Sequence, residues 1–385
     1  MQRVLYLLNV SNPNRLSADS GFTFAELLAP ALADTGAEVT VAAPAPVGDP
    51  RVRYVATASP STKYRARFDP GLDALAAVMR DVRPDVVVAN QVEAVPAVRA
   101  ALLEARVDAL VAGYCHYLPF SFTAGQQMRL DPSLDDGGLG RSVLLAFAAG
   151  LAACDRVLVH SATAASWTSA AAARMSVDLG EKLTVVPAPR DDRLVRDLAD
   201  ASVPEGTAVG VYNHRLYAHY GTAEFTALAR RLLHEAPVRL TVMDLFGQRS
   251  PERIRLDPSP ERFRDELAAL DGVTVASDGG DRVRYRQMLA GSHFGIAPFR
   301  EGCPWSMSVI DCQGMGLPVI APRTGWLAEH IDDELLFDTP DEALSIASRL
   351  ATDAEFYRVQ AKRAHASTVD LAPDQVAARY LEALR

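Results

Sequence analysis

The sequence has few cysteines and no long hydrophobic run. Its four cysteines (Cys115, Cys154, Cys303 and Cys312) are scattered without a C-x-x-C pair, which argues against a zinc site and against a disulfide framework. Its apolar runs are interrupted well before the ~20 residues that a membrane-spanning helix requires. Asn and Pro follow the first apolar run, where a signal peptide would need small residues for cleavage. These absences predict a cytoplasmic protein without a membrane span.

Positive charge is also scarce. The chain has 39 Lys and Arg against 48 Asp and Glu, a formal net charge of −9. Binding a long polyanion depends on clustered cations, and the sequence contains no basic arm or block, so nucleic acid is a disfavoured partner. The composition does not exclude a pocket for a single diphosphate, because such a pocket needs only one or two cations.

What is present is an average globular composition, with 49% hydrophobic and 23% charged residues in a chain of 385. That length favours two domains over one. Short Val- and Leu-rich runs alternate with Ala-rich stretches, as expected of buried parallel strands covered by helices on both faces. The expected strands are 3–10, 38–44, 85–90, 109–115, 156–161, 183–189, 208–213, 238–245, 273–277, 294–299 and 318–323. The expected helices include 22–36 (ending at Gly36), 72–82, 143–154, 162–175 and 373–385.

A polar connection divides this alternation into two series. Residues 190–207 are charged and turn-rich, as expected of a link between domains, and the strand–helix alternation restarts after them. The sequence therefore predicts an α/β protein with two doubly wound Rossmann-like domains, residues 1–195 and 205–365. A terminal helix within 366–385 is expected to pack back toward the first domain. Ligand sites are expected in a cleft lined by the carboxyl ends of the strands.

The most informative motif lies within residues 293–330. Glu301-Gly302 follows an expected strand, and a turn-rich segment then leads through Ser306 into a helix that carries Asp311. The backbone N–H groups near Ser306 would stand at a helix start, where anions bind. The two carboxylates are suited to binding sugar and ribose hydroxyls. The alternative is an ordinary surface Glu beside a helix N-cap.

With this motif the chain resembles glycosyltransferase family 4. The family's donor motif opens with Glu-Gly, has a second acid one helical segment later, and closes with Gly-x-Pro-Val-Ile, here residues 316–320. Asp replaces the second Glu, and the spacing is two residues longer. The resemblance implies the GT-B fold, a nucleotide-sugar donor, retention of anomeric configuration, and no metal or other cofactor. It also implies that Glu301 contacts the donor hexose at the catalytic centre and that Asp311 contacts the nucleoside ribose.

A second patch, residues 211–225, resembles the Arg-x-x-x-x-Lys pair with which the same superfamily binds the donor diphosphate. Arg215 matches the arginine, but Tyr220 stands in place of the lysine. A phenol cannot neutralise a phosphate charge, and the loss of an ammonium removes about 1.5–3 kcal/mol of charge-assisted bonding. A protonated His214 or His219 would compensate in part. The alternative interpretation is that Arg215 caps a helix or pairs with an acidic side chain.

The loops of the first half are expected to hold the acceptor. Gly21, at the start of the first helix, matches the family's glycine-containing loop, which approaches the donor diphosphate. The polar loop before it, with Asn12, favours acceptor contacts.

His116 follows an expected strand, where the family carries a His close to the reacting sugar. It is the leading catalytic candidate, expected to hydrogen-bond the donor sugar or the acceptor rather than act as a strong base. The alternative is a partly buried His bonded to a backbone carbonyl. Tyr117 and Phe120, which come next, either line an acceptor pocket or belong to the core.

The sequence thus predicts a glycosyltransferase that moves a sugar from a nucleotide sugar to a small molecule, in natural-product biosynthesis because the motifs have drifted. The string Asn213-His214-Arg215 resembles the tRNA-queuosine mannosyltransferase branch, which leaves a tRNA nucleoside open as the acceptor despite the negative charge. A sugar-nucleotide epimerase and a non-catalytic sugar-nucleotide-binding partner protein are further alternatives, the latter favoured by Tyr220 and by the altered 301–311 loop. A homodimer is compatible with the sequence.

Overall fold

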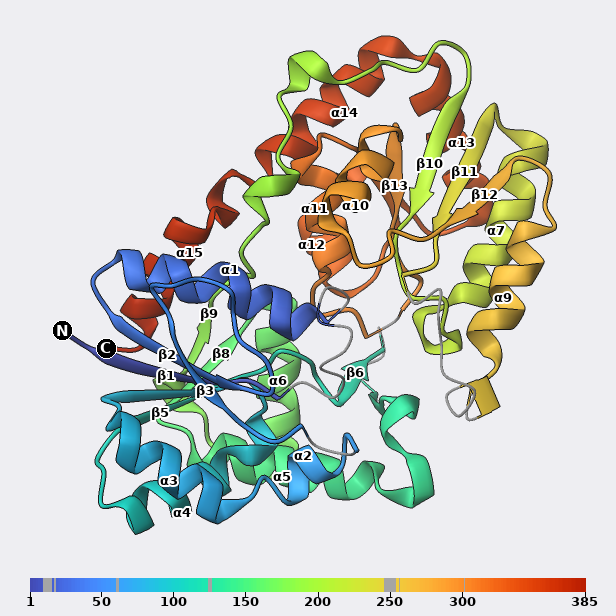
Figure 1. Cartoon of the computed structure of the whole chain (residues 1–385). Helices are drawn as coiled ribbons and strands as arrows, with labels where there is room; N and C mark the ends of the chain where they lie inside the picture. The colour runs from blue at the N-terminus through green and yellow to red at the C-terminus, as the bar shows by residue number, and fades with distance from the viewer. Residues whose placement is uncertain are drawn as a thin grey trace. The chain divides into compact units, whose positions relative to one another are not determined.

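The computed structural model describes residues 1–9, 16, 19–59, 62–123, 127–245, 254–255, 257–300 and 302–385. Two predicted site residues, Asn12 and Glu301, lie outside this described part. The chain forms two compact units, Met1–Pro189 with Leu371–Arg385 and Arg190–Asp370, whose elements are labelled in Figure 1.

Unit 1 (Met1–Pro189 with Leu371–Arg385) is built on a sheet whose seven described strands are all parallel. The strand order is β3-β2-β1-β4-β5-β8-β9, so the direction of winding reverses between β1 and β4. The strands are β1 (Arg3–Leu7), β2 (Glu38–Ala43), β3 (Arg53–Ala56), β4 (Val86–Ala89), β5 (Leu110–Tyr114), β8 (Arg156–Val159) and β9 (Leu183–Val185).

Helices cover both faces of this sheet (Figure 1). They are α1 (Ser20–Asp34), α2 (Arg65–Phe68), α3 (Leu72–Val82), α4 (Val95–Ala105), α5 (Gly140–Ala153), α6 (Ala162–Arg174) and α15 (Pro373–Ala383). Asp19 caps α1 by accepting a hydrogen bond from the Phe22 N–H at 3.0 Å. The helix was expected to end at Gly36; it ends at Asp34, and Gly36 follows in a left-handed conformation with a φ of +91°. A short hairpin, β6 (Phe120–Phe122) with β7 (Met128–Leu130), stands apart from the main sheet.

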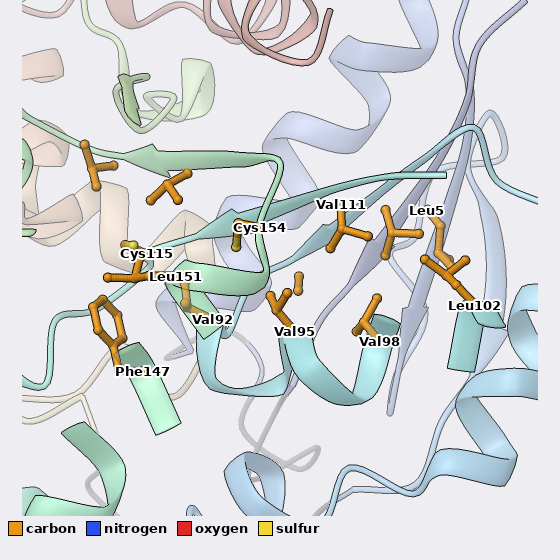
Figure 2. Close-up of a cluster of buried hydrophobic side chains, with 14 of the residues drawn as sticks. Leu5, Val92, Val95, Val98, Leu102, Val111, Cys115, Phe147, Leu151 and Cys154 are labelled. Carbon is orange, nitrogen blue, oxygen red and sulfur yellow. The ribbon is translucent and has the colours of Figure 1, made fainter. Parts of the chain in front are cut away.

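One hydrophobic cluster fills the space between the sheet and helices α3, α4 and α5. Figure 2 shows Val95, Val98 and Leu102 of α4 on the same side of the sheet as Leu5 and Val111. Close approach of the backbone is part of this packing: a Cβ added at Gly150 of α5 would lie 2.0 Å from the carbonyl oxygen of Val92. All four cysteines of the chain are free and buried.

The C-terminal helix α15 packs against α1, as Figure 1 shows. Tyr380 of α15 is fully buried, and its ring centroid lies 5.7 Å from that of Tyr114 and 6.4 Å from that of Phe24. The last helix of the chain is therefore part of the core of unit 1.

Unit 2 (Arg190–Asp370) repeats the design with six parallel strands in its described part. The order β12-β11-β10-β13-β14-β15 places the reversal of winding between β10 and β13. The strands are β10 (Ala208–Tyr212), β11 (Val238–Met243), β12 (Val273–Ala276), β13 (Phe294–Ile296), β14 (Val319–Pro322) and β15 (Leu336–Phe337). The helices are α7 (Thr222–Glu235), α9 (Ser259–Ala268), α10 (Arg282–Ala290), α11 (Met307–Gly314), α12 (Gly325–His330), α13 (Pro340–Thr352) and α14 (Ala354–Ala366).

The predicted fold class is confirmed: each unit is a doubly wound, parallel α/β sheet. Ligands of such sheets bind outside the carboxyl ends of the strands, where the winding reverses. Among the helices that the structure describes, none combines the length and apolar character needed to cross a membrane.

Candidate functional site

The switch point of unit 2 lies between β10 and β13. Four of the predicted donor residues, Arg215, Tyr220, Ser306 and Asp311, lie in the segments that follow these two strands, whereas Gly21 belongs to unit 1. Asn213 directly follows β10 and is almost fully buried. Its side-chain Nδ2 donates to the Tyr285 hydroxyl at 2.8 Å and to the Ser308 carbonyl at 3.0 Å. A single amide thus ties the loop after β10 to α10 and to the first turn of α11.

Asp311 extends this network into α11. Its side chain is 3% exposed, and its carboxylate accepts hydrogen bonds from the Tyr285 hydroxyl at 3.0 Å and from Arg282 Nη2 at 3.3 Å. Burial raises the pKa of Asp311 to about 6, although Arg282 acts in the opposite direction. The structure therefore shows Asp311 inside a buried network, and its predicted contact with a ribose stays a prediction.

Arg282 connects Asp311 to a second buried acid at the start of unit 2. Its Nε donates to Asp191 at 2.8 Å, and Arg193 Nε donates to the same carboxylate at 2.9 Å. Burial alone would raise the pKa of Asp191, but its bonds to Arg193 and Arg282 outweigh this and lower the pKa. Spacing in the sequence gave no signal for this pairing of Asp191, Arg282 and Asp311.

His214 cannot supply positive charge to a diphosphate. Its side chain is buried, and its Nε2 lies 3.1 Å from the Ile296 carbonyl, a distance at which an Nε2–H donates to that oxygen. Burial lowers the pKa of His214 to about 3, so the imidazole is neutral near pH 7. The prediction that a protonated His214 compensates for the missing lysine is therefore wrong, because the ring is desolvated. The neighbouring His219 stacks on Tyr217, with ring centroids 5.3 Å apart.

Arg300, in the segment that follows β13, brings a cation beside Tyr220, the residue that stands in place of the lysine. Its guanidinium lies 5.5 Å from the ring centroid of Tyr220, within the range of a cation–π contact. Sequence reasoning did not assign Arg300 to the donor, although its place directly after the strand expected at 294–299 was a usable signal. Arg215, which follows β10, is half-buried on the same loop as Tyr220.

Gly221 allows the two loops of this switch point to touch. It has a φ of +70°, and a Cβ built there would lie 2.5 Å from the Cβ and 2.7 Å from the carbonyl oxygen of Phe299. No other residue fits such a contact at low cost, since both the conformation and the space favour glycine. The close approach is what brings Tyr220 near Arg300.

Ser306 occupies its predicted place as the N-cap of α11. Its hydroxyl accepts a hydrogen bond from the Val309 N–H at 3.4 Å. The N–H groups of a first helical turn lack intrahelical partners and favour anions. The predicted donor contact through Ser306 and its neighbours stays a prediction, and Glu301, just upstream, lies outside the described residues.

In unit 1, His116 and Ser20 lie together at the carboxyl side of β5 and the start of α1. His116 Nε2 is 3.0 Å from Ser20 Oγ, so a hydroxyl joins the predicted catalytic ring to the helix start. Gly21 packs tightly there, since an added Cβ would lie 3.3 Å from Asn90 Nδ2. His160, whose ring centroid is 5.8 Å from that of His116, bonds the Tyr114 hydroxyl at 2.7 Å. Burial holds the pKa of His160 well below its ordinary value.

The two aromatic residues predicted to touch the acceptor lie in different surroundings. Phe120 is 2% exposed, and its ring centroid lies 5.5 Å from that of Phe147. The structure therefore places Phe120 in the core and gives no support to an acceptor contact, because neighbouring side chains cover the ring. The Tyr117 hydroxyl donates to Glu93 and accepts from Arg67 Nε, the latter at 2.8 Å. Arg67 and Glu93 are themselves paired at 3.2 Å and buried.

Known proteins resemble this chain in sequence and in fold. Residues 22–194, which run from α1 past the last strand of unit 1 to the first residues of unit 2, match the model of Glycosyltransferase Family 4. Sucrose-phosphate synthase from Thermosynechococcus elongatus is 18% identical with a TM-score of 0.76, over 99% of this chain and 98% of that one. HepE of Anabaena, solved with UDP and glucose, is 14% identical with a TM-score of 0.70, over 100% of this chain and 99% of that one. Trehalose-6-phosphate synthase, OtsA, is 11% identical with a TM-score of 0.71, over 100% of this chain and 99% of that one.

The fold and these matches define the class: the chain is a glycosyltransferase of the GT-B fold. More particularly, residues 22–194 match the model of Glycosyltransferase Family 4 over somewhat less than half of the chain. The family resemblance drawn from the donor motif is thereby confirmed, whereas the tRNA-queuosine branch stays a prediction. No curated protein sequence matches the chain.

Proposed function

We propose that this chain transfers a hexose from a uridine diphosphate sugar to a small-molecule acceptor. The grouping of Arg215, Arg300 and the first turn of α11 around the switch point of unit 2 carries the proposal. HepE, which has a similar fold, was solved with UDP and glucose, and we assign a donor of that chemical class.

The two arginines provide the positive charge that the usual lysine would give to the diphosphate. A diphosphate requires positive charge and directed donors, and a guanidinium supplies both through its planar fork. His214 is neutral, so the charge falls to Arg215 and to Arg300 beside Tyr220. Asp311 is assigned to the nucleoside side of the site, where Asn213 and Tyr285 fix the helix that carries it. Glu301 keeps its proposed contact with the hexose.

The transfer forms one bond and breaks one bond at the anomeric carbon. The acceptor hydroxyl oxygen bonds to that carbon, and the bond from the carbon to the diphosphate oxygen breaks, so the electron pair leaves with the nucleoside diphosphate. The hydroxyl proton passes to the departing phosphate oxygen. Arginines and helix N–H groups aimed at that oxygen stabilise its growing charge. We propose that the configuration is retained and that these residues serve without a metal.

His116 is proposed to meet the sugar or the acceptor from unit 1. Its bond to Ser20, at 3.0 Å, restricts rotation of the imidazole, and a fixed ring is better placed to orient a hydroxyl. Gly21 and Asn12 stay assigned to the donor and the acceptor respectively. Natural-product biosynthesis remains the proposed setting, because the donor motif departs from the family pattern in its spacing and second acid.

The structure weakens the case for a tRNA nucleoside as the acceptor. Asn213 and His214, the first two residues of the string that suggested it, are buried and bonded inside unit 2. Their internal bonds explain both residues without a nucleic acid, and the chain carries a net charge of −9. The non-catalytic alternative rested on Tyr220 and on the altered 301–311 loop. The contact of Arg300 with Tyr220 supports a charge that offsets the first of these departures.

A thermal-shift screen across nucleotide sugars, followed by a transfer assay, tests the proposal. A ligand at 100 times its Kd adds about 2.7 kcal/mol to stability, so UDP-hexoses are expected to raise the Tm. Arg215→Met and Arg300→Met are expected to reduce the shift, whereas Arg230→Met, at an exposed ion pair with Glu266, is expected to keep it. The absence of a shift with every nucleotide sugar, or equal shifts in all variants, would contradict the proposal.

A further inference from the structure

A cavity of about 300 Å³ lies inside unit 1 at the switch point of its sheet. It is lined by residues at the carboxyl ends of β1, β2 and β4, by the segment that follows β3, and by α2, α3 and the start of α4. This is the position at which open α/β sheets hold their ligands. Its volume is at the lower end of the range for small-molecule sites.

Most of the buried part of the cavity wall is aliphatic. This aliphatic part includes Ala42, Leu75, Val78, Ala89, Ala94 and Val98, each at most 9% exposed. Figure 2 shows Val98 on α4, whose neighbours Val95 and Leu102 belong to the main core. Such a wall offers water no hydrogen bonds, so it favours an apolar body.

The polar residues of the wall carry no net charge. Asn9, Asn90 and Gln91 supply side-chain amides, and Asn9 Nδ2 donates to Gln91 Oε1 at 2.9 Å. The charged side chains among the described lining residues are Arg65 and Asp69 of the α2 region, paired at 3.3 Å and both more than half exposed. The amides can both donate to and accept from a hydroxyl, whereas a phosphate dianion would find a single arginine that already has a partner.

The polar side of the cavity adjoins the candidate catalytic residue. Asn90 lies against the start of α1, since a Cβ on Gly21 would stand 3.3 Å from its Nδ2. The preceding residue, Ser20, is bonded to His116 at 3.0 Å. A hydroxyl held by the amides would therefore lie on the same side of unit 1 as His116.

Resting on the function proposed above, we infer that this cavity binds the acceptor and that the acceptor is a neutral alcohol with a compact aliphatic or alicyclic body. A sugar phosphate does not fit the wall, because the one cation among the described lining residues, Arg65, is already paired with Asp69. An apolar cavity of about 150 Å³ holds benzene, so one about twice as large accommodates about a dozen non-hydrogen atoms. A bicyclic terpenoid alcohol has this size and polarity.

Isothermal titration calorimetry with borneol, in the absence of any donor, tests the inference. Borneol is expected to bind the native chain and Ala100→Leu, an exposed position on α4. It is expected to bind Ala94→Leu at least tenfold more weakly, because the added carbon atoms fill the cavity. Glucose 6-phosphate is expected to bind at least tenfold more weakly than borneol. Equal borneol affinities in the two variants, or tighter binding of glucose 6-phosphate, would overturn the inference.

A variant with a larger cavity covers the case in which Ala94→Leu does not fold. Leu75→Ala is expected to raise the affinity for the tricyclic alcohol cedrol at least fivefold relative to borneol, and an unchanged ratio would count against the cavity as the site. The thermal shift with UDP-glucose, measured on the same samples, separates this inference from the proposed function. A shift with the donor but no borneol binding overturns only the acceptor class. Borneol binding without any donor shift instead contradicts the proposed transfer.

Discussion

Arg282 Nη2 lies 3.3 Å from both carboxylate oxygens of Asp311. The same guanidinium donates from Nε to Asp191 at 2.8 Å. One arginine therefore holds two buried acids, one at the start of unit 2 and one in the helix of the donor motif. Removing it would leave two carboxylates desolvated and close together.

Arg282→Met is accordingly expected to lower the free energy of unfolding by roughly 3 kcal/mol, the usual effect of breaking a buried ion pair. Arg264→Met is the matched control in unit 2, because its partner Asp265 is 70% exposed, and a change below about 1 kcal/mol is expected there. Denaturant unfolding of both variants measures the difference. Equal effects would show that the buried pairing contributes little.

The raised pKa of Asp311 predicts a specific pH dependence. The group titrates at about 6 in the folded chain against an ordinary value of 3.8, so between these values the folded chain keeps a proton that the unfolded chain has lost. The free energy of unfolding therefore decreases as pH rises through this window. The decrease is up to about 3 kcal/mol at about 1.36 kcal/mol per pKa unit.

Asp311→Asn cannot titrate and provides the comparison. The stability difference between the native chain and this variant is expected to change between pH 4 and pH 6.5 and to be constant above that range. Denaturant unfolding at several pH values measures it. A difference that is constant across the whole range would contradict the assigned pKa.

Tyr117→Phe separates a structural role from an acceptor contact. The hydroxyl joins the buried Arg67 and Glu93, so its loss is expected to cost roughly 1–3 kcal/mol of stability. Tyr54→Phe, at a half-buried position on β3, is the control, with an expected change below about 0.5 kcal/mol. A stable Tyr117→Phe chain with a raised KM for the acceptor would instead support the contact predicted from the sequence.

Gly221→Ala tests the contact between the two loops of the donor side. The positive φ alone costs about 1–2 kcal/mol, and the added Cβ would stand 2.5 Å from Phe299. Gly279→Ala isolates the conformational part, because Gly279 also has a positive φ, +66°, but nothing within 4 Å of an added Cβ. A larger loss of stability and of donor affinity in Gly221→Ala is expected. Equal losses would show that the close approach is unimportant.

The main strands were predictable because burial on both faces demands continuous apolar runs. Each of the eleven predicted runs contains a strand of one of the two sheets. The helix expected at 72–82 has those bounds, with left-handed residues at Gly71 and Arg83 on either side. The edge strand β3 was missed because its residues are half-buried or exposed, which removes the apolar signal.

The site was less predictable, because its decisive contacts join distant segments. Arg300 meets Tyr220 only because the carboxyl ends of β10 and β13 are neighbours in the folded sheet. The burial of His214, which makes it neutral, follows from packing that spacing does not encode. Residue type indicated which groups could bind a donor, but burial in the folded chain determines which of them are charged.

A crystal structure of the chain with bound UDP tests the central claim most directly. The account predicts a diphosphate within hydrogen-bond distance of the Arg215 guanidinium and of the first-turn N–H groups of α11, beside the carboxyl ends of β10 and β13. UDP bound elsewhere on the chain, or a diphosphate that Arg215 does not touch, would contradict it.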